Sequence, residues 1–110
     1  MSHRSDSLLF DDIMDAAGSI GAYIEGLDQD GFAKDRKTSD AVVRNLEIIG
    51  EAAARLSDSG RRQVAGVEWP QIVGLRNRIV HEYFGVDLSL IWKIIRDDLP
   101  SIVEAIRASR

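Results

Sequence analysis

Apolar residues recur at every third or fourth position along nearly the whole chain, and this spacing constrains the fold most. It first appears in the series Leu9, Ile13, Ile20, Ile24 and Leu27. Side chains spaced in this way lie on one face of an α-helix. No stretch alternates apolar and polar residues for long enough to predict a strand. We therefore expect an all-α fold, an up-and-down helical bundle.

Capping residues predict the limits of the first two long helices. Ser7 precedes the first apolar series and is a plausible N-cap, because its hydroxyl can accept a hydrogen bond from a free backbone N–H. The second helix is expected to begin near Thr38–Asp40, which offer capping oxygens, and to run to about Ser57. Its apolar residues lie on two sides, which is typical of a central helix or of a central helix that also forms an oligomer interface.

Two prolines predict where the later helices begin and bend. Pro70 suits a first helical position, so the third long helix should begin there, and Gly85 should close it. Asp87 is the expected cap of a fourth helix. Pro100 has no backbone N–H to donate, so we expect a kink or break near Asp97–Leu99.

Composition predicts one soluble cytoplasmic domain, residues 1–110, with residues 1–6 as a mobile tail. A chain of 110 residues has the usual size of a single domain. It has no cysteine, which excludes disulfides, thiolate metal sites and cysteine nucleophiles. No apolar run approaches the roughly 18 residues that a membrane span needs, and no signal peptide is evident.

The net charge of −4 limits any role with nucleic acid. Proteins that hold long nucleic acids by charge are usually basic. Any binding of RNA must therefore depend on a local cationic site, which the overall field of the molecule does not assist.

The stretch "GLRNRIVHEYFGVD", residues 74–87, holds the most reactive combination of side chains. Histidine exchanges protons near neutral pH, and the planar arginine fork suits phosphate. Together they suit RNA cleavage without a metal or other cofactor, in which the ribose 2′-hydroxyl attacks its own phosphate. The alternative is structural: Arg76 in a surface ion pair, with His81 and Tyr83 satisfying buried hydrogen bonds.

Helix geometry complicates a site made from Arg76 and His81. Residues five apart are separated by about 140° around an ideal helix. Either the helix distorts before His81, or a second copy of the chain completes the site across a two-fold axis.

The spacing of Arg76, His81 and Tyr83 resembles the R-x4-H-x-Y motif of the HEPN superfamily, in its HepT-like branch. The setting also matches, since "DRKTSDAVVRNLEIIGEAAARLS" resembles the second helix of that branch, and "WPQIVGLRNRIVHEYFGVDLSLIW" with "DDLP" resembles its C-terminal half. The resemblance extends from Leu8 to about Ile106.

This resemblance implies a homodimeric toxin of a bacterial toxin–antitoxin system, with the motif helix at the dimer interface. It implies metal-independent RNA cleavage with Arg76 and His81 as catalytic residues. The implied antitoxin is a nucleotidyltransferase of the MNT type, which transfers AMP from ATP to Tyr83 and so silences the nuclease. Asn77 matches the polar residue that commonly follows the motif arginine, and Arg78 adds positive charge to the cleft.

Several other residues allow two interpretations. Asp11 and Asp15 suit either a metal site or the positive start of a helix. Glu47 and Glu51 suit a metal site or a salt-bridged stripe with Arg44 and Arg55. A third interpretation is that this stripe faces the cleft of the RNA-cleaving site, where Glu51 would position Arg76 or His81. We expect Trp69 and Trp92 to belong to the core. Arg61 and Arg62 fit a solvated loop better than an extension of the cleft. No role is expected for His3.

Two further hypotheses stay open. In the first, the chain is a catalytically silent dimeric module that binds a nucleotidyltransferase or a nucleotide. The acidic composition favours this hypothesis. In the second, the chain is a purely structural helical dimer, and the charged motif has no explanation.

Overall fold

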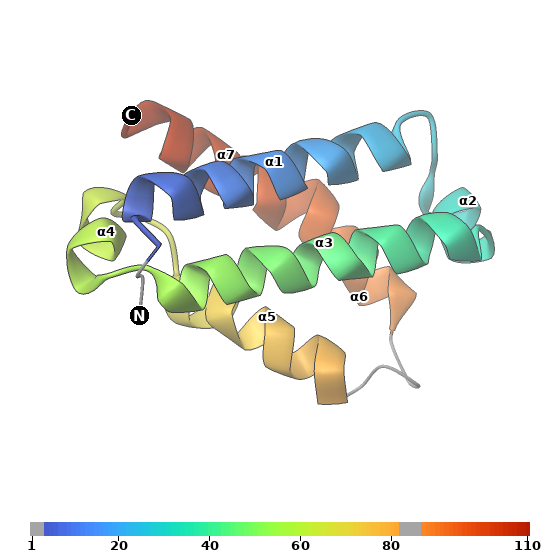
Figure 1. The fold of residues 1–110 in the computed structure, drawn as a ribbon. Helices are drawn as coiled ribbons and strands as arrows, with labels where there is room; N and C mark the ends of the chain where they lie inside the picture. The colour runs from blue at the N-terminus through green and yellow to red at the C-terminus, as the bar shows by residue number, and fades with distance from the viewer. Residues whose placement is uncertain (1–3, 82–86) are drawn as a thin grey trace.

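The computed structural model describes residues 4–81 and 87–110, and its long helices form a bundle (Figure 1). Helices α1 (Asp6–Ile24) and α3 (Arg36–Arg55) lie side by side, and α5 (Trp69–His81) packs on α3. Helix α7 (Leu99–Ala108) contacts α1. The shorter elements are α2 (Gln29–Lys34), α4 (Asp58–Gln63), α6 (Leu88–Lys93) and the π-helix η2 (Ile94–Asp98). The all-α prediction is confirmed, and the described residues include no strand.

Both long N-terminal helices begin earlier than the sequence predicted. Ser5, and not Ser7, caps α1, and its Oγ accepts a hydrogen bond from the Leu8 N–H at 3.3 Å. The helix therefore begins inside the segment expected to be a tail. Asp35 caps α3 and accepts from the Thr38 N–H at 3.1 Å. The expected capping residue Thr38 lies in the first turn, where its hydroxyl donates to Asp35 at 2.8 Å.

The segment after α3, which carries the expected loop residues Arg61 and Arg62, folds into the short helix α4. Ser57 caps this helix, and its Oγ accepts from the Gly60 N–H at 3.0 Å. The Asp6 carboxylate accepts from the Ser57 N–H at 2.9 Å and also from its hydroxyl. Gly60 lies directly against this carboxylate, because a Cβ there would come within 2.7 Å of Asp6. These contacts fix α4 to the start of α1.

The core lies mainly between α1 and α3. Phe10, Ile13 and Ile20 of α1 belong to the same buried cluster as Leu46 and Ile49 of α3, and all five are almost completely buried. The short helix α2 adds Phe32, whose exposed fraction is 0%. Phe32 therefore ties this short helix to the core. Its ring lies 5.3 Å from that of the half-buried Trp92, which belongs to the edge of the core.

The distortion predicted near Pro100 is confirmed, and it has the form of a π-helix. The Leu99 N–H bonds to the Ile94 carbonyl, five residues back, in place of the four of an α-helix. Pro100 lacks an N–H and its ring would clash with the carbonyl four residues earlier, so the backbone widens before it. Asp87 caps α6 as predicted and accepts from the Ser89 N–H at 3.0 Å. Gly85 lies outside the described residues.

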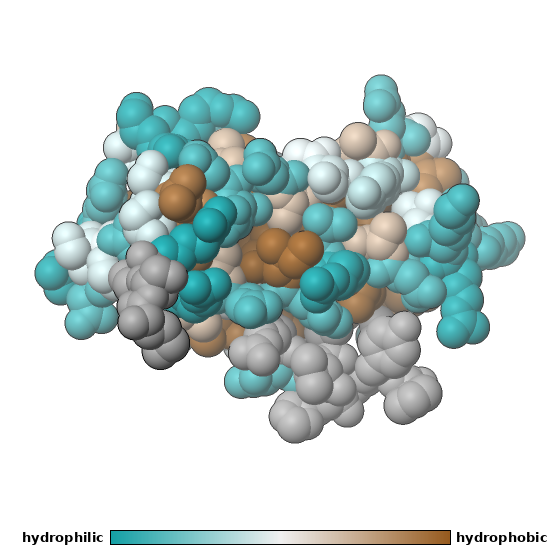
Figure 2. Space-filling view, in the orientation of Figure 1, coloured by the Kyte–Doolittle hydropathy of each residue, from teal (hydrophilic) through white to brown (hydrophobic). Residues whose placement is uncertain are grey.

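The surface is mainly hydrophilic on the side that Figure 2 shows, with a small hydrophobic area near its middle. Large exposed hydrophobic side chains in the described ranges are limited to Leu8 and Tyr23. Within these same ranges, no helix combines the length and apolar character needed to cross a membrane.

Candidate active site

Helix α5 carries the motif, and Trp69 anchors its first turn. The indole Nε1–H donates to the carbonyls of Arg61 and Val64 at 3.1 and 3.3 Å. The ring lies 6.3 Å from that of Phe10. Trp69 is therefore a core residue, as predicted, and α5 begins one residue before the expected Pro70. Its Ile72 and Leu75 are also buried.

The backbone of α5 resolves one of the alternatives that the sequence left open. The helix is α-helical from Trp69 to His81, so the distortion considered before His81 does not occur. Positions 76 and 81 are then separated by about 140° around the helix. One copy of this helix does not place both positions on the same face.

The predicted site residues fall into two groups. Arg76, Arg78 and His81 belong to α5, but their side chains are outside the described part of the structure, as is the whole of Tyr83. The side chain of Asn77 is described, and it is exposed on α5. The catalytic roles of Arg76 and His81, and the role of Tyr83 as an acceptor, therefore stay predictions.

Glu51 lies exposed on α3, the helix against which α5 packs. One turn earlier on α3, Glu47 forms an ion pair with Arg44, with Nη1 and Oε2 3.6 Å apart. Of the salt-bridged stripe predicted on this helix, the ion pair between Arg44 and Glu47 is therefore present. The structure leaves open the prediction that Glu51 supports a catalytic side chain.

Arg61 has a structural role that sequence reasoning missed. Its Nη2 donates to the carbonyls of Ala53 and Ala54 at 3.2 Å each, at the end of α3. These carbonyls belong to the last turn of α3, where that of Ala53 also accepts from the Leu56 N–H at 3.3 Å, so the guanidinium group serves as an additional C-terminal cap. The expectation of a solvated loop was wrong for Arg61, whereas Arg62 is exposed. The sequence signal was a basic residue soon after the end of a predicted helix.

Two aspartates of α1, Asp11 and Asp12, form ion pairs. Asp11 accepts from Arg110 Nη1 at 2.6 Å, and Asp12 accepts from Arg4 Nε at 2.7 Å. The second contact raises the pKa of Arg4. Because the helix begins at Asp6, the first-turn carboxylate is that of Asp6, and the helix-start interpretation of Asp11 and Asp15 was wrong. In the described ranges, no group of three or more acidic, histidine or cysteine side chains is placed to hold a metal ion.

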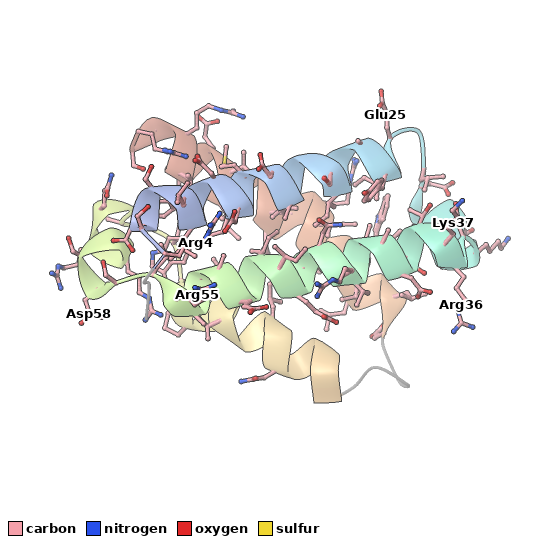
Figure 3. All side chains as sticks on the ribbon, viewed as in Figure 1. Arg4, Glu25, Arg36, Lys37, Arg55 and Asp58 are labelled. Carbon is pink, nitrogen blue, oxygen red and sulfur yellow. The ribbon has the colours of Figure 1, made fainter. Side chains whose placement is uncertain are left out.

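Two exposed caps carry perturbed carboxylates. The Thr38 hydroxyl and N–H hold the pKa of Asp35 below its usual value, and Ser89 with the Leu90 N–H does the same for Asp87. The labelled cations of α3 lie at its two ends, with Arg36 and Lys37 at one and Arg55 at the other (Figure 3). Arg36 pairs loosely with Asp40 at 3.8 Å.

Comparison with known sequences identifies the class of protein that this fold and motif represent. The sequence model of the HepT-like ribonuclease family ("Ribonuclease HepT-like") matches residues 13–109. The chain belongs to this family, and hence to the HepT-like branch of the HEPN ribonucleases.

Individual relatives agree with this assignment. The chain is 37% identical over 102 residues to the protein named "Putative RNase MJ1380" of Methanocaldococcus jannaschii, covering 93% of this chain and 94% of the relative. It is 34% identical to the "Probable ribonuclease HepT" of Thermococcus cleftensis, covering 90% of each. No solved structure gave a significant match.

Proposed function

We propose that this chain is a metal-independent endoribonuclease whose active site forms between two copies of helix α5. Membership of a ribonuclease family supports the activity. The observation that carries the composite site is the regular α-helix from Trp69 to His81, which separates positions 76 and 81 by about 140°. Two copies facing each other across a two-fold axis bring Arg76 of one protomer toward His81 of its partner.

The proposed chemistry needs only these side chains and the RNA. His81 accepts the proton of a ribose 2′-hydroxyl, which attacks the adjacent phosphorus, and the protonated His81 returns that proton to the 5′-oxygen of the next nucleotide as its bond to phosphorus breaks. Arg76 stabilises the negative charge on the phosphorane. Asn77 and Arg78 hold the phosphate, and Glu51 positions a catalytic side chain from α3.

Mixing two inactive variants tests whether the site is shared. Arg76→Ala and His81→Ala are each expected to lose about 10²–10⁴-fold in cleavage rate. When the two are unfolded together and refolded, a heterodimer contains one shared site with both native residues. Random pairing then restores about a quarter of the wild-type activity. If the mixture stays as inactive as its components while remaining dimeric, the two residues act within one protomer.

Metal independence has its own test. Wild-type protein is expected to cleave a fluorescently labelled RNA equally fast in EDTA and in Mg²⁺. A loss of activity in EDTA that Mg²⁺ restores would contradict the proposal. If the His81→Ala variant cleaves RNA as fast as the wild type, the assignment of His81 as a catalytic residue is wrong.

The proposed cellular role is that of the toxin in a cytoplasmic toxin–antitoxin pair. The antitoxin would be an MNT-type nucleotidyltransferase that transfers AMP from ATP to the Tyr83 hydroxyl, releasing pyrophosphate. The added negative charge repels RNA phosphate from the site. Intact mass spectrometry after incubation with this enzyme and ATP should show added AMP on wild type and none on Tyr83→Phe. Modification of both proteins to the same extent would place the acceptor elsewhere.

A second candidate function keeps the partner but removes the catalysis. In this alternative, the chain is a silent dimeric module that binds the nucleotidyltransferase or a nucleotide, and its net charge of −4 is the observation in favour. Expression without the partner separates the two. The nuclease arrests growth unless His81 is changed, whereas the silent module has no effect.

A further inference from the structure

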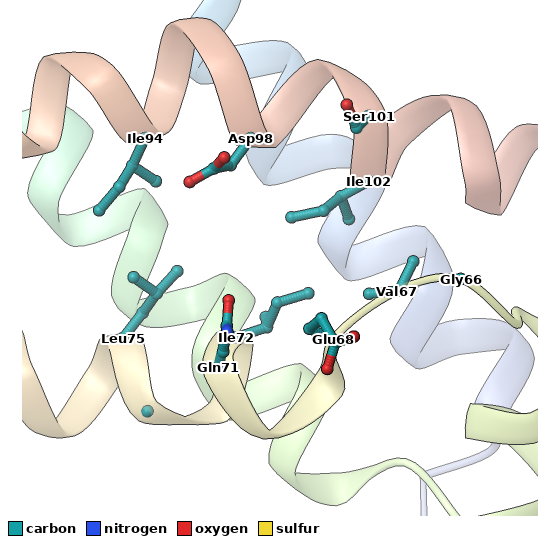
Figure 4. Close-up of a pocket in the computed structure, with 11 residues that line it drawn as sticks. Gly66, Val67, Glu68, Gln71, Ile72, Leu75, Ile94, Asp98, Ser101 and Ile102 are labelled. Carbon is teal, nitrogen blue, oxygen red and sulfur yellow. The ribbon is translucent and has the colours of Figure 1, made fainter.

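A groove of about 440 Å³ separates α5 from the η2–α7 segment (Figure 4). Its size is in the range of binding clefts. The floor is apolar, and Figure 4 shows Leu75 of α5 and Ile94 of η2 pointing toward one another across it. Ile72 and Ile102 extend this floor. The groove is present because α5 packs chiefly on α3.

The rim of the groove is acidic. Glu68 and Asp98 line it from its two walls, and both side chains are exposed. Among the described residues, neither takes part in an ion pair, and no lysine or arginine lines the groove. Two unpaired carboxylates on a chain with a net charge of −4 repel an RNA backbone and attract cations.

The dimensions of the groove match a helix. From Glu68 to Leu75 the wall extends about 10 Å, at 1.5 Å for each residue. This is the length over which a bound amphipathic helix presents anchors at positions i, i+4 and i+7. The opposite wall includes the π-helix η2, and such irregular turns are frequent at functional sites.

From these features we infer that the groove binds a basic amphipathic helix of another protein, with aliphatic anchors on the floor and lysine or arginine beside Glu68 and Asp98. A second copy of this chain fits poorly. Its large exposed hydrophobic side chains in the described ranges are Leu8 and Tyr23, and Leu8 is followed one turn later by Asp11 and Asp12.

The groove lies on the side of α5 opposite to position 81, and position 76 borders it. Ideal geometry places position 76 about 40°, position 77 about 140° and position 81 about 180° around the helix from Ile72. A helix in the groove therefore leaves the exposed Asn77 side uncovered. Peptide binding is measured in the absence of RNA, so binding and cleavage are separate measurements.

Three synthetic peptides test this site by fluorescence anisotropy with the full chain. The first peptide carries leucines at positions i, i+4 and i+7 on an alanine background, with lysines beside them. The second peptide has glutamate in place of each lysine. The third has alanine in place of each leucine. We expect only the first to bind appreciably. Equal binding of the first and third would show general charge attraction and would overturn the proposal, as would failure of all three.

Matched variants locate the binding. Glu68→Gln/Asp98→Asn should weaken binding of the lysine peptide about fivefold or more. The control Glu25→Gln/Asp30→Asn makes the same charge change away from the groove and should have no effect. Ile102→Ala should also weaken binding, by about threefold, while Ile48→Ala on α3 should not. Equal losses in test and control variants would contradict the assignment.

Light scattering and RNA cleavage complete the experiment. The groove variants should keep the wild-type oligomeric state and cleavage rate, whether that rate is high or zero. A change of oligomeric state in Ile102→Ala or in the double variant would identify the groove as a contact between copies and overturn the proposal. Peptide binding does not depend on nuclease activity, so failure of the proposed function would leave this result interpretable.

Discussion

The two sides of the bundle are packed differently. Between α1 and α3, side chains such as Ile13, Leu46 and Ile49 have an exposed fraction of 0%. On the side of α5 and α7, Ile102 and Val103 are only partly buried, and a groove separates the helices. The first side is therefore closely packed, while the second retains apolar surface that a partner can cover.

The largest expected effect tests this difference directly. Ile49→Ala removes a fully buried side chain between α1 and α3 and should lower the free energy of unfolding by about 2–5 kcal/mol. Ile102→Ala on the groove should cost about 1 kcal/mol or less, because its side chain is already partly exposed. Urea unfolding measures both. Equal losses would show that the groove is closed in solution.

The next effect concerns the contact between α4 and α1. Gly60→Ala should destabilise the fold by about 1–3 kcal/mol, because the new Cβ would lie 2.7 Å from the Asp6 carboxylate, which Ser57 holds in place. Gly18→Ala is the matched control, since a Cβ there meets nothing within 4 Å and alanine favours the helix. Thermal unfolding should move in opposite directions for the two variants.

A smaller loss is expected at the end of α3. Arg61→Ala should cost about 1–2 kcal/mol, because the carbonyls of Ala53 and Ala54 lose a charged donor. Arg62→Ala, at an exposed neighbouring position, should leave the unfolding free energy nearly unchanged. Identical unfolding curves for the two variants would show that the cap contributes nothing.

The smallest effect depends on pH. The pKa of Asp87 is lowered in the folded state, chiefly by the Ser89 hydroxyl, so its stabilising contribution is present above its unfolded pKa of about 4. That contribution is lost as the pH falls through the folded pKa. Asp87→Asn should therefore flatten the acid limb of the stability profile, measured by urea unfolding across the acidic range. An unchanged acid limb in Asp87→Asn would contradict this account.

The sequence predicted the helices well because apolar spacing and prolines act locally. Pro100 alone indicated the distortion before it, since the missing N–H is a property of that residue. The helix starts were less accurate, because Ser5 and Ser7 are equally good caps in sequence and only packing selects between them. Asp6 shows why: its carboxylate is held by Ser57, a residue 51 positions away.

The candidate site was predictable in its residues but not in its surroundings. Arg76 and His81 stand out by their chemistry, and their spacing predicts the angle between them. Glu68 and Asp98, in contrast, are 30 positions apart and have no unusual neighbours. They line one groove only because α5 packs chiefly on α3 and η2–α7 lies across from it.

The π-helix η2 also determines where the length of this chain can change. A residue deleted from an α-helix rotates everything after it by about 100°. A π turn already contains one residue more than an α turn, so removal of one residue between Ile94 and Asp98 would return the segment to α geometry. With Pro100 also replaced, Leu99 and Ile106 would keep their direction toward the core. The chain can therefore shorten by one residue here without repacking α7 or moving the wall of the groove that it forms.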